Sequence, residues 1–363
     1  MATVDGTSAD AGVGFVALLV ATGALSALAT WLAIRYARRR RLLDLPGQRR
    51  SHRVPTPRGG GVAIVVAMLA GGAALALATG AGGCFALLAP PVVGVAWVGW
   101  LDDHGGLSML KRLAMHAAAA LWVLAAPLAP AFGVPVPGPV GALPSAAVAL
   151  VVALAIVWSI NLHNFMDGID GLLASQALFV FCALAALLAA RGAGGADALL
   201  VGAAACAGFL PFNFPRARVF MGDVGSGALG FAIAVAVLWQ LGTPRLAATS
   251  GLVLCSAFAT DATCTLVSRI VRGRRWYSAH REHLYQWLVR CGFSHAQVVG
   301  IYMGWNLLIA LPVVCWMNRA VPAAGARAPA GLGALLLVYA AAAALWWRGK
   351  RGCLRTMRSR HAA

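Results

Sequence analysis

Long apolar stretches set the fold class of this chain. The sequence of 363 residues is 61% hydrophobic, its mean hydropathy is +0.79, and apolar runs of about 17–22 residues recur along its length. A helix of about 20 residues crosses the hydrocarbon core of a bilayer while satisfying its own backbone hydrogen bonds. The sequence therefore predicts an all-α polytopic membrane protein with one integral membrane domain over residues 1–363.

Eleven runs are long enough to be spans. The predicted spans are 11–34, 59–80, 84–101, 113–130, 143–160, 172–190, 197–214, 227–242, 246–269, 298–317 and 329–347. The first run lacks the basic flank of a signal peptide, because Asp5 and Asp10 precede it, so we expect it to remain as a helix.

The basic residues predict the orientation. With alternating spans, 25 of the 29 Lys and Arg residues fall on one side, and Arg191, Arg245, Arg319 and Arg327 fall on the other. The positive-inside rule makes the first side cytoplasmic, with the N-terminus periplasmic and the C-terminus cytoplasmic. The net charge of +18 is spread over juxtamembrane loops and a basic tail at 348–363. This favours contact with anionic membrane lipid and argues against a nucleic-acid partner.

Acidic residues are scarce, and their positions indicate function. Only 11 residues are Asp or Glu. Five of the aspartates lie in short polar breaks on the predicted cytoplasmic side, namely Asp102, Asp103, Asp167, Asp170 and Asp223. A carboxylate near the centre of a membrane helix costs roughly 2.5–3.5 kcal/mol on insertion scales. Five of them at span ends suggest a shared divalent-cation site within an active site built from cytoplasmic loops.

The first cytoplasmic loop runs from Asp44 to the glycines at 59–61. The three glycines precede a span, so their amides could cradle a phosphate at a helix N-terminus, with His52 and Arg58 nearby. A basic connector with a glycine hinge explains the same residues and is favoured for this loop taken alone.

The second loop contains adjacent carboxylates at a span end. At an effective dielectric constant near 20, two such charges about 4 Å apart repel by about 4 kcal/mol. A bound cation or a shared proton would relieve the repulsion between Asp102 and Asp103. Capping of the next helix explains one of these aspartates but not both.

The third loop concentrates hard oxygen ligands. Asn161, Asn164, Asp167 and Asp170 lie within ten positions without a basic residue, which suits Mg²⁺ or a sugar hydroxyl and amide. His163, in the same loop, is interpreted as a packed or capping histidine.

The fourth loop brings arginines and a carboxylate to the opening of a span. Arg216 and Arg218 could meet phosphate oxygens, and Asp223 and Ser226 lie in a Gly-Asp-Val-Gly-Ser run that also offers backbone amides. Helix capping explains Asp223 or Ser226 alone, but not the whole cluster.

The fifth loop contains two histidines three residues apart among basic residues. His280 and His283, with Arg281, could clamp a diphosphate. A zinc site is the rival interpretation, but the other candidate ligands are oxygens, so phosphate contact is favoured. Asp261 lies inside the ninth predicted span, where either a functional role or a hydrogen bond within the bundle would explain it.

Together these loops resemble those of the polyprenyl-phosphate N-acetylhexosamine-1-phosphate transferase family, which includes the phospho-muramoyl-pentapeptide translocase. The matching elements run from about residue 44 to 290. They are Pro55-Thr-Pro-Arg58-Gly-Gly, Asp102-Asp103, Asn164-Phe-Met-Asp167-Gly-Ile-Asp170-Gly, Phe220-Met-Gly-Asp223-Val-Gly-Ser226 and His280-x-x-His283. Each motif is weak alone, but all occur in the family's order.

The resemblance implies a reaction. A lipid phosphate, undecaprenyl phosphate in bacteria, attacks the β-phosphate of a UDP-N-acetyl sugar, with Mg²⁺ required and Mn²⁺ as a substitute, and UMP leaves. It implies that Asp103 and Asp223 hold the metal and that Asp102 is the general base or its closest neighbour. It further implies that Asp167 and Asp170 support the metal or nucleotide, while His280 and His283 contact phosphate or sugar. Direct attack is preferred to a covalent aspartyl intermediate. The expected substrate-binding residues are His52, Arg58, Gly60, Lys111, Asn161, Asn164, Arg218, Ser226 and Arg281.

The fifth loop departs from the denser histidine cluster of many members, because Arg281 and Glu282 interrupt it. It looks more like the branch that initiates O-antigen or other surface polysaccharides, in which the donor is often a 6-deoxy-N-acetylhexosamine. The resemblance also implies an inner-membrane location and a homodimer. A transporter or lipid-linked sugar flippase is the rival, but it predicts intramembrane charges and an inverted repeat. The sequence has one buried acid and no convincing repeat.

Overall fold

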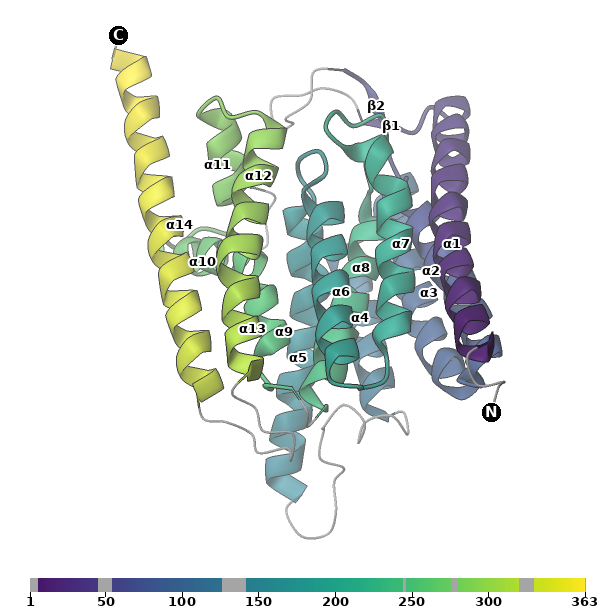
Figure 1. The fold of residues 1–363 in the computed structure, drawn as a ribbon. Helices are drawn as coiled ribbons and strands as arrows, with labels where there is room; N and C mark the ends of the chain where they lie inside the picture. Colours follow the sequence, from purple (N-terminus) through teal and green to yellow (C-terminus); the bar gives the residue numbers. More distant parts are fainter. Residues whose placement is uncertain are drawn as a thin grey trace.

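The computed structural model describes residues 6–44, 54–125, 142–243, 246–275, 280–319 and 330–362. Most of its helices stand roughly side by side in one bundle (Figure 1). Helix α1 begins at one end of this bundle and α14 finishes at the other (Figure 1). The placement of the two termini on opposite sides of a membrane stays a prediction.

In chain order the elements are α1 (Gly6–Arg39), β1 (Leu43–Asp44), β2 (Thr56–Pro57), α2 (Val62–Thr79), α3 (Gly82–Gly105), α4 (Met109–Ala125), α5 (Ala142–Met166), α6 (Leu172–Ala190), α7 (Ala196–Asn213), α8 (Asp223–Leu241), α9 (Ser250–Leu254), α10 (Ser256–Val271), α11 (Leu284–Arg290), α12 (His295–Trp305), a π-helical turn (Asn306–Ala310), α13 (Leu311–Arg319) and α14 (Ala330–Ala362). The strands β1 and β2 pair antiparallel, with Leu43 opposite Pro57.

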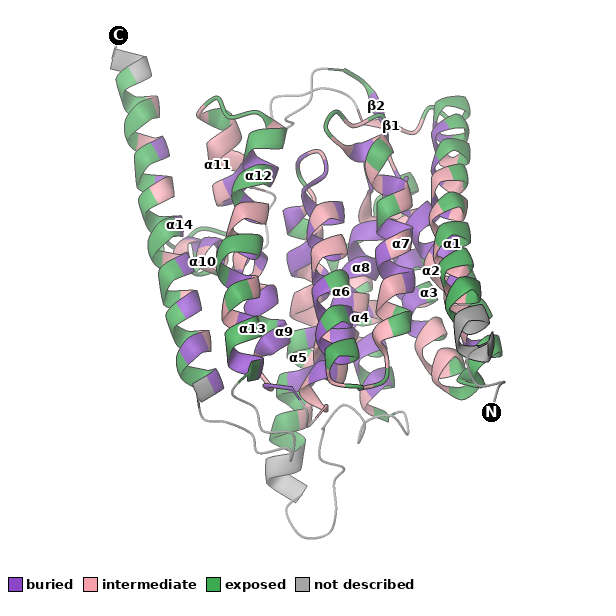
Figure 2. Ribbon diagram, in the orientation of Figure 1, coloured by how far each residue is buried: buried purple, intermediate pink, exposed green. Residues whose placement is uncertain are grey.

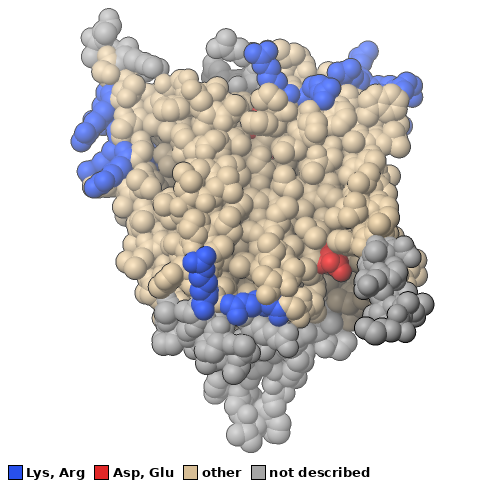
Figure 3. Space-filling model, in the orientation of Figure 1, with Lys and Arg blue, Asp and Glu red and all other residues tan. Residues whose placement is uncertain are grey.

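Within the described residues, nine helical stretches are long and apolar enough to cross a membrane. The protein is therefore an all-α, multi-pass membrane protein. The predicted total of eleven spans stays a prediction, as does the assignment of the basic side to the cytoplasm. Figure 3 shows Lys and Arg side chains gathered mainly at the end that bears β1 and β2, above a broad belt almost free of charge.

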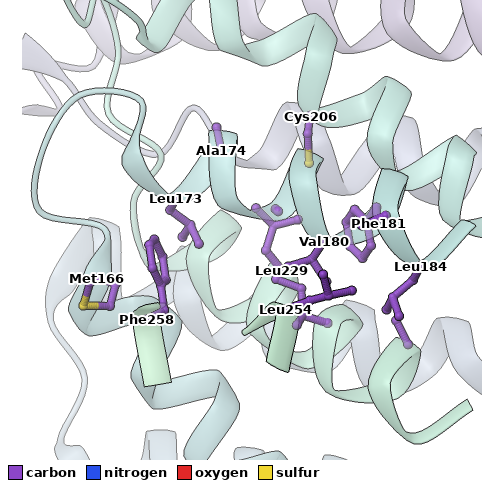
Figure 4. Packing of buried hydrophobic residues seen from close by; sticks show 14 of the residues in the cluster. Met166, Leu173, Ala174, Val180, Phe181, Leu184, Cys206, Leu229, Leu254 and Phe258 are labelled. Carbon is purple, nitrogen blue, oxygen red and sulfur yellow. The ribbon is translucent and has the colours of Figure 1, made fainter. Parts of the chain in front are cut away.

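The buried core lies around α6 and α8. In Figure 2 the buried residues concentrate in the middle of the bundle, whereas α1 and α14 expose much of their length. Leu173 and Phe181 of α6 pack with Cys206 of α7, Leu229 of α8 and Phe258 of α10 (Figure 4). Lipid-facing helices at the rim and a close-packed centre are the arrangement expected when the bilayer is the solvent.

Glycines let three helices approach the first turns of α8. A Cβ added at Gly99 of α3 would lie 2.4 Å from the Asp223 carbonyl oxygen, and one added at Gly61 would lie 2.4 Å from Gly225 Cα. A Cβ at Gly230 would lie 2.8 Å from Ile160 Cα of α5. Small residues allow membrane helices to pack backbone to backbone. Here they hold Asp223, the first residue of α8, at the meeting point of α2, α3 and α5.

The ninth apolar stretch, predicted as one span over 246–269, is broken. A turn at Cys255 separates α9 from α10, and α10 reaches from α5 to α14 obliquely to the upright helices (Figure 1). Five of its buried residues are polar, namely Ser256, Thr260, Asp261, Thr265 and Arg269. Mean hydropathy does not detect this break, because the apolar residues of α10 compensate for the polar ones.

Candidate active site

One cavity opens at the end of the bundle that bears the motif loops. Its volume is about 320 Å³, within the range of small-molecule sites. The lining residues are Asp44, Arg58, Asn164, Asp167, Gly168, Ile169, Asn213, Phe220, Met221, Gly222, Asp223, Arg281, Gln286, Val289 and Arg290. Segments far apart in the sequence therefore bring carboxylates, amides and guanidiniums to one space.

Asp103 is buried at the base of this region and fixes the start of α8. Its carboxylate accepts hydrogen bonds from the backbone N–H groups of Asp223 and Val224, each at 3.2 Å. The Arg58 guanidinium donates to the same carboxylate, at 2.7 Å from Nη2. A carboxylate at a helix N-terminus satisfies unpaired amides and complements the helix dipole. Asp103 thus connects the first, second and fourth loops.

Arg112, in the first turn of α4, links Asp102 to Asp223. Its Nη1 lies 2.7 Å from Asp102 Oδ2 and 2.8 Å from Asp223 Oδ2. The other oxygen of Asp102 accepts a hydrogen bond from the Leu107 backbone amide. The carboxyl groups of Asp102 and Asp223 also lie within hydrogen-bonding contact of each other. One guanidinium is therefore shared by two neighbouring carboxylates and compensates only part of their charge.

Asn164, in the last turn of α5, holds the second oxygen of Asp223. Its Nδ2 donates to Asp223 Oδ1 at 2.9 Å and to Ser226 Oγ at 3.0 Å. Ser226 is fully buried, whereas Asn164 also lines the cavity. These contacts orient the Asp223 carboxylate toward the third loop.

Asp167 faces the cavity from the loop between α5 and α6. Its carboxylate accepts a hydrogen bond from the Gly222 amide, and no described Lys or Arg forms an ion pair with it. Gly222 has φ +75°, and a Cβ there would lie 2.4 Å from Asp103 Oδ2, so only glycine fits. Burial, followed by the nearby carboxylates of Asp223 and Asp103, raises the pKa of Asp167 well above its usual value.

Helix α11 closes the cavity from the fifth loop. The buried Tyr285 hydroxyl donates to the Phe165 carbonyl at 2.9 Å and sits against Gly168, where an added Cβ would collide with it. Arg281, Gln286 and Arg290 line the cavity. Arginines opposite carboxylates give the site groups for both a cation and a phosphate.

The two histidines of the fifth loop stack on each other, with ring centroids 5.0 Å apart. Among the described residues, the lining of the cavity does not include His280 or His283. Burial lowers the pKa of His280 to about 4 and also lowers the pKa of His283. Both rings are neutral at pH 7, so they can hydrogen-bond a phosphate but cannot attract it as cations.

Four other predicted site residues lie beside the cavity without lining it. Asp170 Oδ2 accepts from the Ala217 amide at 3.1 Å and lies 3.2 Å from His295 Nδ1, which fixes it to the fourth loop and α12. Asn161 donates to the Val157 carbonyl at 2.7 Å and lines a small slot inside the bundle. Lys111 and Arg218 are exposed, and Arg218 donates to the Pro211 carbonyl.

Two of the three amides in the possible phosphate cradle at 59–61 are engaged by the fourth loop. The Gly60 amide donates to the Phe220 carbonyl at 2.9 Å, and the Gly61 amide donates to the Met221 carbonyl at 2.8 Å. A Cβ at Gly60 would lie 2.5 Å from Val219 Cγ2, so close packing against the fourth loop explains this glycine. His52 lies outside the described residues.

Comparison with known proteins gives consistent matches. The family model described as glycosyl transferase family 4 matches residues 85–240. A decaprenyl-phosphate N-acetylglucosaminephosphotransferase of Mycobacterium tuberculosis is 31% identical over 296 residues, covering 73% of each chain. Its counterpart in Mycobacterium leprae is 30% identical, covering 78% of each chain. The undecaprenyl-phosphate α-N-acetylglucosaminyl 1-phosphate transferase of Escherichia coli K12 is 25% identical, covering 84% of each chain.

The chain belongs to the polyprenyl-phosphate N-acetylhexosamine-1-phosphate transferase family. The region matched by the family model contains Asp102, Asp103, Asp167 and Asp223, which meet in and beside the cavity of this family member. Arg58 and the α11 segment lie outside that region but reach the same site.

Sequence reasoning missed Arg112 and selected its neighbour Lys111. Both lie in the first turn of α4, but only Arg112 points at carboxylates. Residue spacing gives a signal, because Arg112 follows Asp102 by ten positions across a short turn. Which of the two adjacent basic residues turns inward depends on where α4 begins, at Met109. An error of one residue in that boundary changes the choice.

The donor set fits a hard divalent cation. Asp167 and Asp223 bring carboxylate oxygens to the cavity, and Asn164 adds an amide. Within the described residues, no group of three or more His, Cys, Asp or Glu side chains is arranged to hold a metal. Mg²⁺ is commonly bound by one or two carboxylates together with substrate phosphates, so two carboxylates are sufficient.

Proposed function

We propose that this protein transfers an N-acetylhexosamine 1-phosphate from a UDP-sugar to undecaprenyl phosphate in the bacterial inner membrane. The observation that carries the proposal is that Asp167 and Asp223 line the same cavity as Arg58, Arg281 and Arg290. Carboxylates can hold Mg²⁺, and arginines can bind the diphosphate. The named activities of the relatives, all polyprenyl-phosphate sugar-phosphate transferases, support the same reaction.

The reaction needs little covalent chemistry from the protein. An oxygen of the lipid phosphate forms a bond to the β-phosphorus of the UDP-sugar. The bond between that phosphorus and the bridging oxygen breaks, and UMP leaves with the bonding electrons. A bound Mg²⁺ would neutralise charge that develops on the phosphates. Catalysis then depends mainly on positioning and on preorganised charge.

The residues have distinct proposed roles. Asp167 and Asp223 would hold the metal, with Asn164 orienting Asp223. Asp103 would contribute by fixing the first turn of α8, because its oxygens already accept from Arg58 and two amides. Asp102 keeps its proposed place as base or neighbour of the base.

The cationic side of the cavity would bind the nucleotide diphosphate. Arg281 and Arg290 come from the α11 segment, which Tyr285 docks onto the third loop. A guanidinium pairs with phosphate oxygens through two parallel N–H groups, which fixes orientation as well as charge. The role in initiating O-antigen-type polysaccharide, the 6-deoxy donor and the homodimer are parts of the proposal carried by the family resemblance.

The test supplies purified protein with undecaprenyl phosphate, Mg²⁺ and a panel of UDP-N-acetyl sugars, and measures UMP and the lipid diphosphosugar. We expect turnover with at least one donor, equal amounts of the two products, and none without lipid phosphate or after chelation of Mg²⁺. Mn²⁺ should substitute in part. Absence of turnover with every donor would contradict the proposal and favour the transporter alternative.

A further inference from the structure

The shared guanidinium of Arg112 has a consequence for cation binding. Both oxygens of Asp223 are already engaged, Oδ2 by Arg112 at 2.8 Å and Oδ1 by Asn164 at 2.9 Å. Each of these oxygens keeps a second lone pair, but a divalent cation prefers a negative charge that no neighbouring cation already compensates. A cation that binds Asp223 must therefore compete with a side chain of the protein itself.

Of the two side chains that contact Asp223, Arg112 is the one that a divalent cation would repel. Asn164 is neutral and can remain beside Asp223, whereas a guanidinium and a divalent cation on the same carboxylate repel each other. Arg112 also keeps a second anchor when it leaves Asp223, because Nη1 lies 2.7 Å from Asp102 Oδ2. The Leu107 amide fixes the other oxygen of Asp102.

The surroundings of Arg112 offer the guanidinium a place beside the metal. Arg112 and Asp223 line a slot of about 10 Å³, enough for about one water, together with His116 and Asn161. Asp223 and Asn164 line both this slot and the main cavity. Arg112 contacts Asp223, which lines the main cavity, so a guanidinium released from Asp223 would still lie beside that cavity.

We propose that Arg112 is an internal counter-ion that the divalent cation displaces from Asp223 and that then serves the substrate diphosphate. In the substrate-free protein it prevents Asp102 and Asp223 from repelling each other. This inference rests on the proposed function, because it takes the ion at Asp223 to be the metal of the transfer reaction.

The proposal predicts effects of opposite sign for two ligands. Replacing Arg112 by glutamine removes the competitor, so the substrate-free protein should bind a divalent cation more tightly. The same change removes a phosphate partner, so it should bind the UDP-sugar more weakly. An arginine that only contacts substrate would weaken UDP-sugar binding and leave cation binding unchanged.

The experiment measures Mn²⁺ binding to the detergent-purified full chain without substrate, from the electron paramagnetic resonance signal of the free ion. Arg112→Gln should lower the Kd for Mn²⁺ about tenfold. It should raise the Kd for UDP-N-acetylglucosamine at saturating Mn²⁺ several-fold. Arg39→Gln is the matched control, since it removes an equal charge from an exposed position in the last turn of α1 at the same end, and it should change neither value.

Unchanged or weaker Mn²⁺ binding in a folded Arg112→Gln protein would overturn the proposal. If that variant aggregates, Arg112→Met is measured instead. It also removes the charge beside Asp223, so it should bind Mn²⁺ more tightly than wild type, and equal affinity would also overturn the proposal. If wild-type protein binds no Mn²⁺, or if Asp223→Asn leaves Mn²⁺ binding unchanged, the metal site of the proposed function is refuted. This outcome can be told apart from a failure of the Arg112 proposal alone, in which Asp223-dependent Mn²⁺ binding is retained.

Discussion

Two aspartates in this protein, Asp261 fully buried and Asp223 partly exposed, have opposite surroundings. Asp261, on α10, is surrounded by donors: its carboxylate accepts from the Leu284 amide at 2.7 Å, the Tyr302 hydroxyl at 2.6 Å and the Trp346 indole at 2.9 Å. Asp223 shares one guanidinium with Asp102 and opens onto a cavity. The sequence places Asp223 in a motif at the opening of a span and Asp261 inside a predicted span, but it shows the contacts of neither.

The difference in surroundings indicates a different role for each carboxylate. The donors of Asp261 come from α11, α12 and α14, so its charge is used up in holding three helices together. Around Asp223 the carboxylates outnumber the cations that contact them, and this excess suits a metal ion. Asp261 should therefore govern stability and Asp223 activity.

The largest effect that tests this comparison is expected at Asp223. Asp223→Asn keeps the size of the side chain and its contact with Asn164 but removes the charge that would hold the metal. We expect the rate of UMP release to fall about a thousandfold or more, with the melting temperature within about 2 °C of wild type. Full activity in the variant would remove the metal assignment.

The next effect concerns Asp261. Asp261→Ala leaves several buried donors without an acceptor, and each such group costs about 1–3 kcal/mol. We expect the melting temperature to fall by about 10 °C or more. It is measured by fluorescence-detected size-exclusion chromatography of samples heated to increasing temperatures. Asp261→Asn retains one acceptor and should lie between the two. A stable but inactive alanine variant would move Asp261 into the class of Asp223 and break the comparison.

The third prediction uses pH to separate the two surroundings. The pKa of Asp167 is raised in the folded protein by burial and then by Asp223 and Asp103, so the folded state holds a proton that the unfolded state has released. Metal-free protein should therefore lose stability as pH rises from the unfolded pKa toward the folded one. Asp167→Asn, which is permanently neutral, should melt about 2–4 °C higher than wild type at pH 7.5 without metal.

This difference should shrink toward pH 4 and reverse when Mg²⁺ is added, because only wild type gains a charged ligand. Asp261→Asn provides the contrast, since it should lower the melting temperature at every pH. If Asp167→Asn melts below wild type in metal-free buffer at pH 7.5, the carboxylate is not the unfavourable group we infer.

The sequence was sufficient to predict the helical class and the loops that meet at the site. The length of the apolar stretches predicts the helices, and the polar segments between them predict where the helices end. The sequence could not predict which side chains contact each other, because these contacts depend on the angles at which the helices cross. Asp103 caps α8, which begins 120 residues later, and the Gly60 amide pairs with a carbonyl of the fourth loop. Neither contact leaves a local pattern.

Asp261 shows the same limit from the other side. The sequence allowed both a functional role and a hydrogen bond within the bundle, and its partners decide for the second. The break at Cys255 that turns α10 toward α14 makes those partners available. Hydropathy averaged over the ninth stretch hides the break and therefore the role.

The smallest effect tests whether Asp261 holds α11 on α14. The thiols of Cys291, just after α11, and Cys353, on α14, are in hydrogen-bonding contact. A mild thiol oxidant such as diamide should therefore join them in a disulfide, and mass spectrometry should detect the linked peptide. Transferase activity should change less than about twofold, because neither cysteine lines the cavity. Asp261→Ala frees the start of α11 from α14 and should slow the cross-link, whereas Asp223→Asn should not. Equal cross-linking in all three proteins would show that the α11–α14 contact does not need Asp261, and its role would then be limited to the contacts with α12.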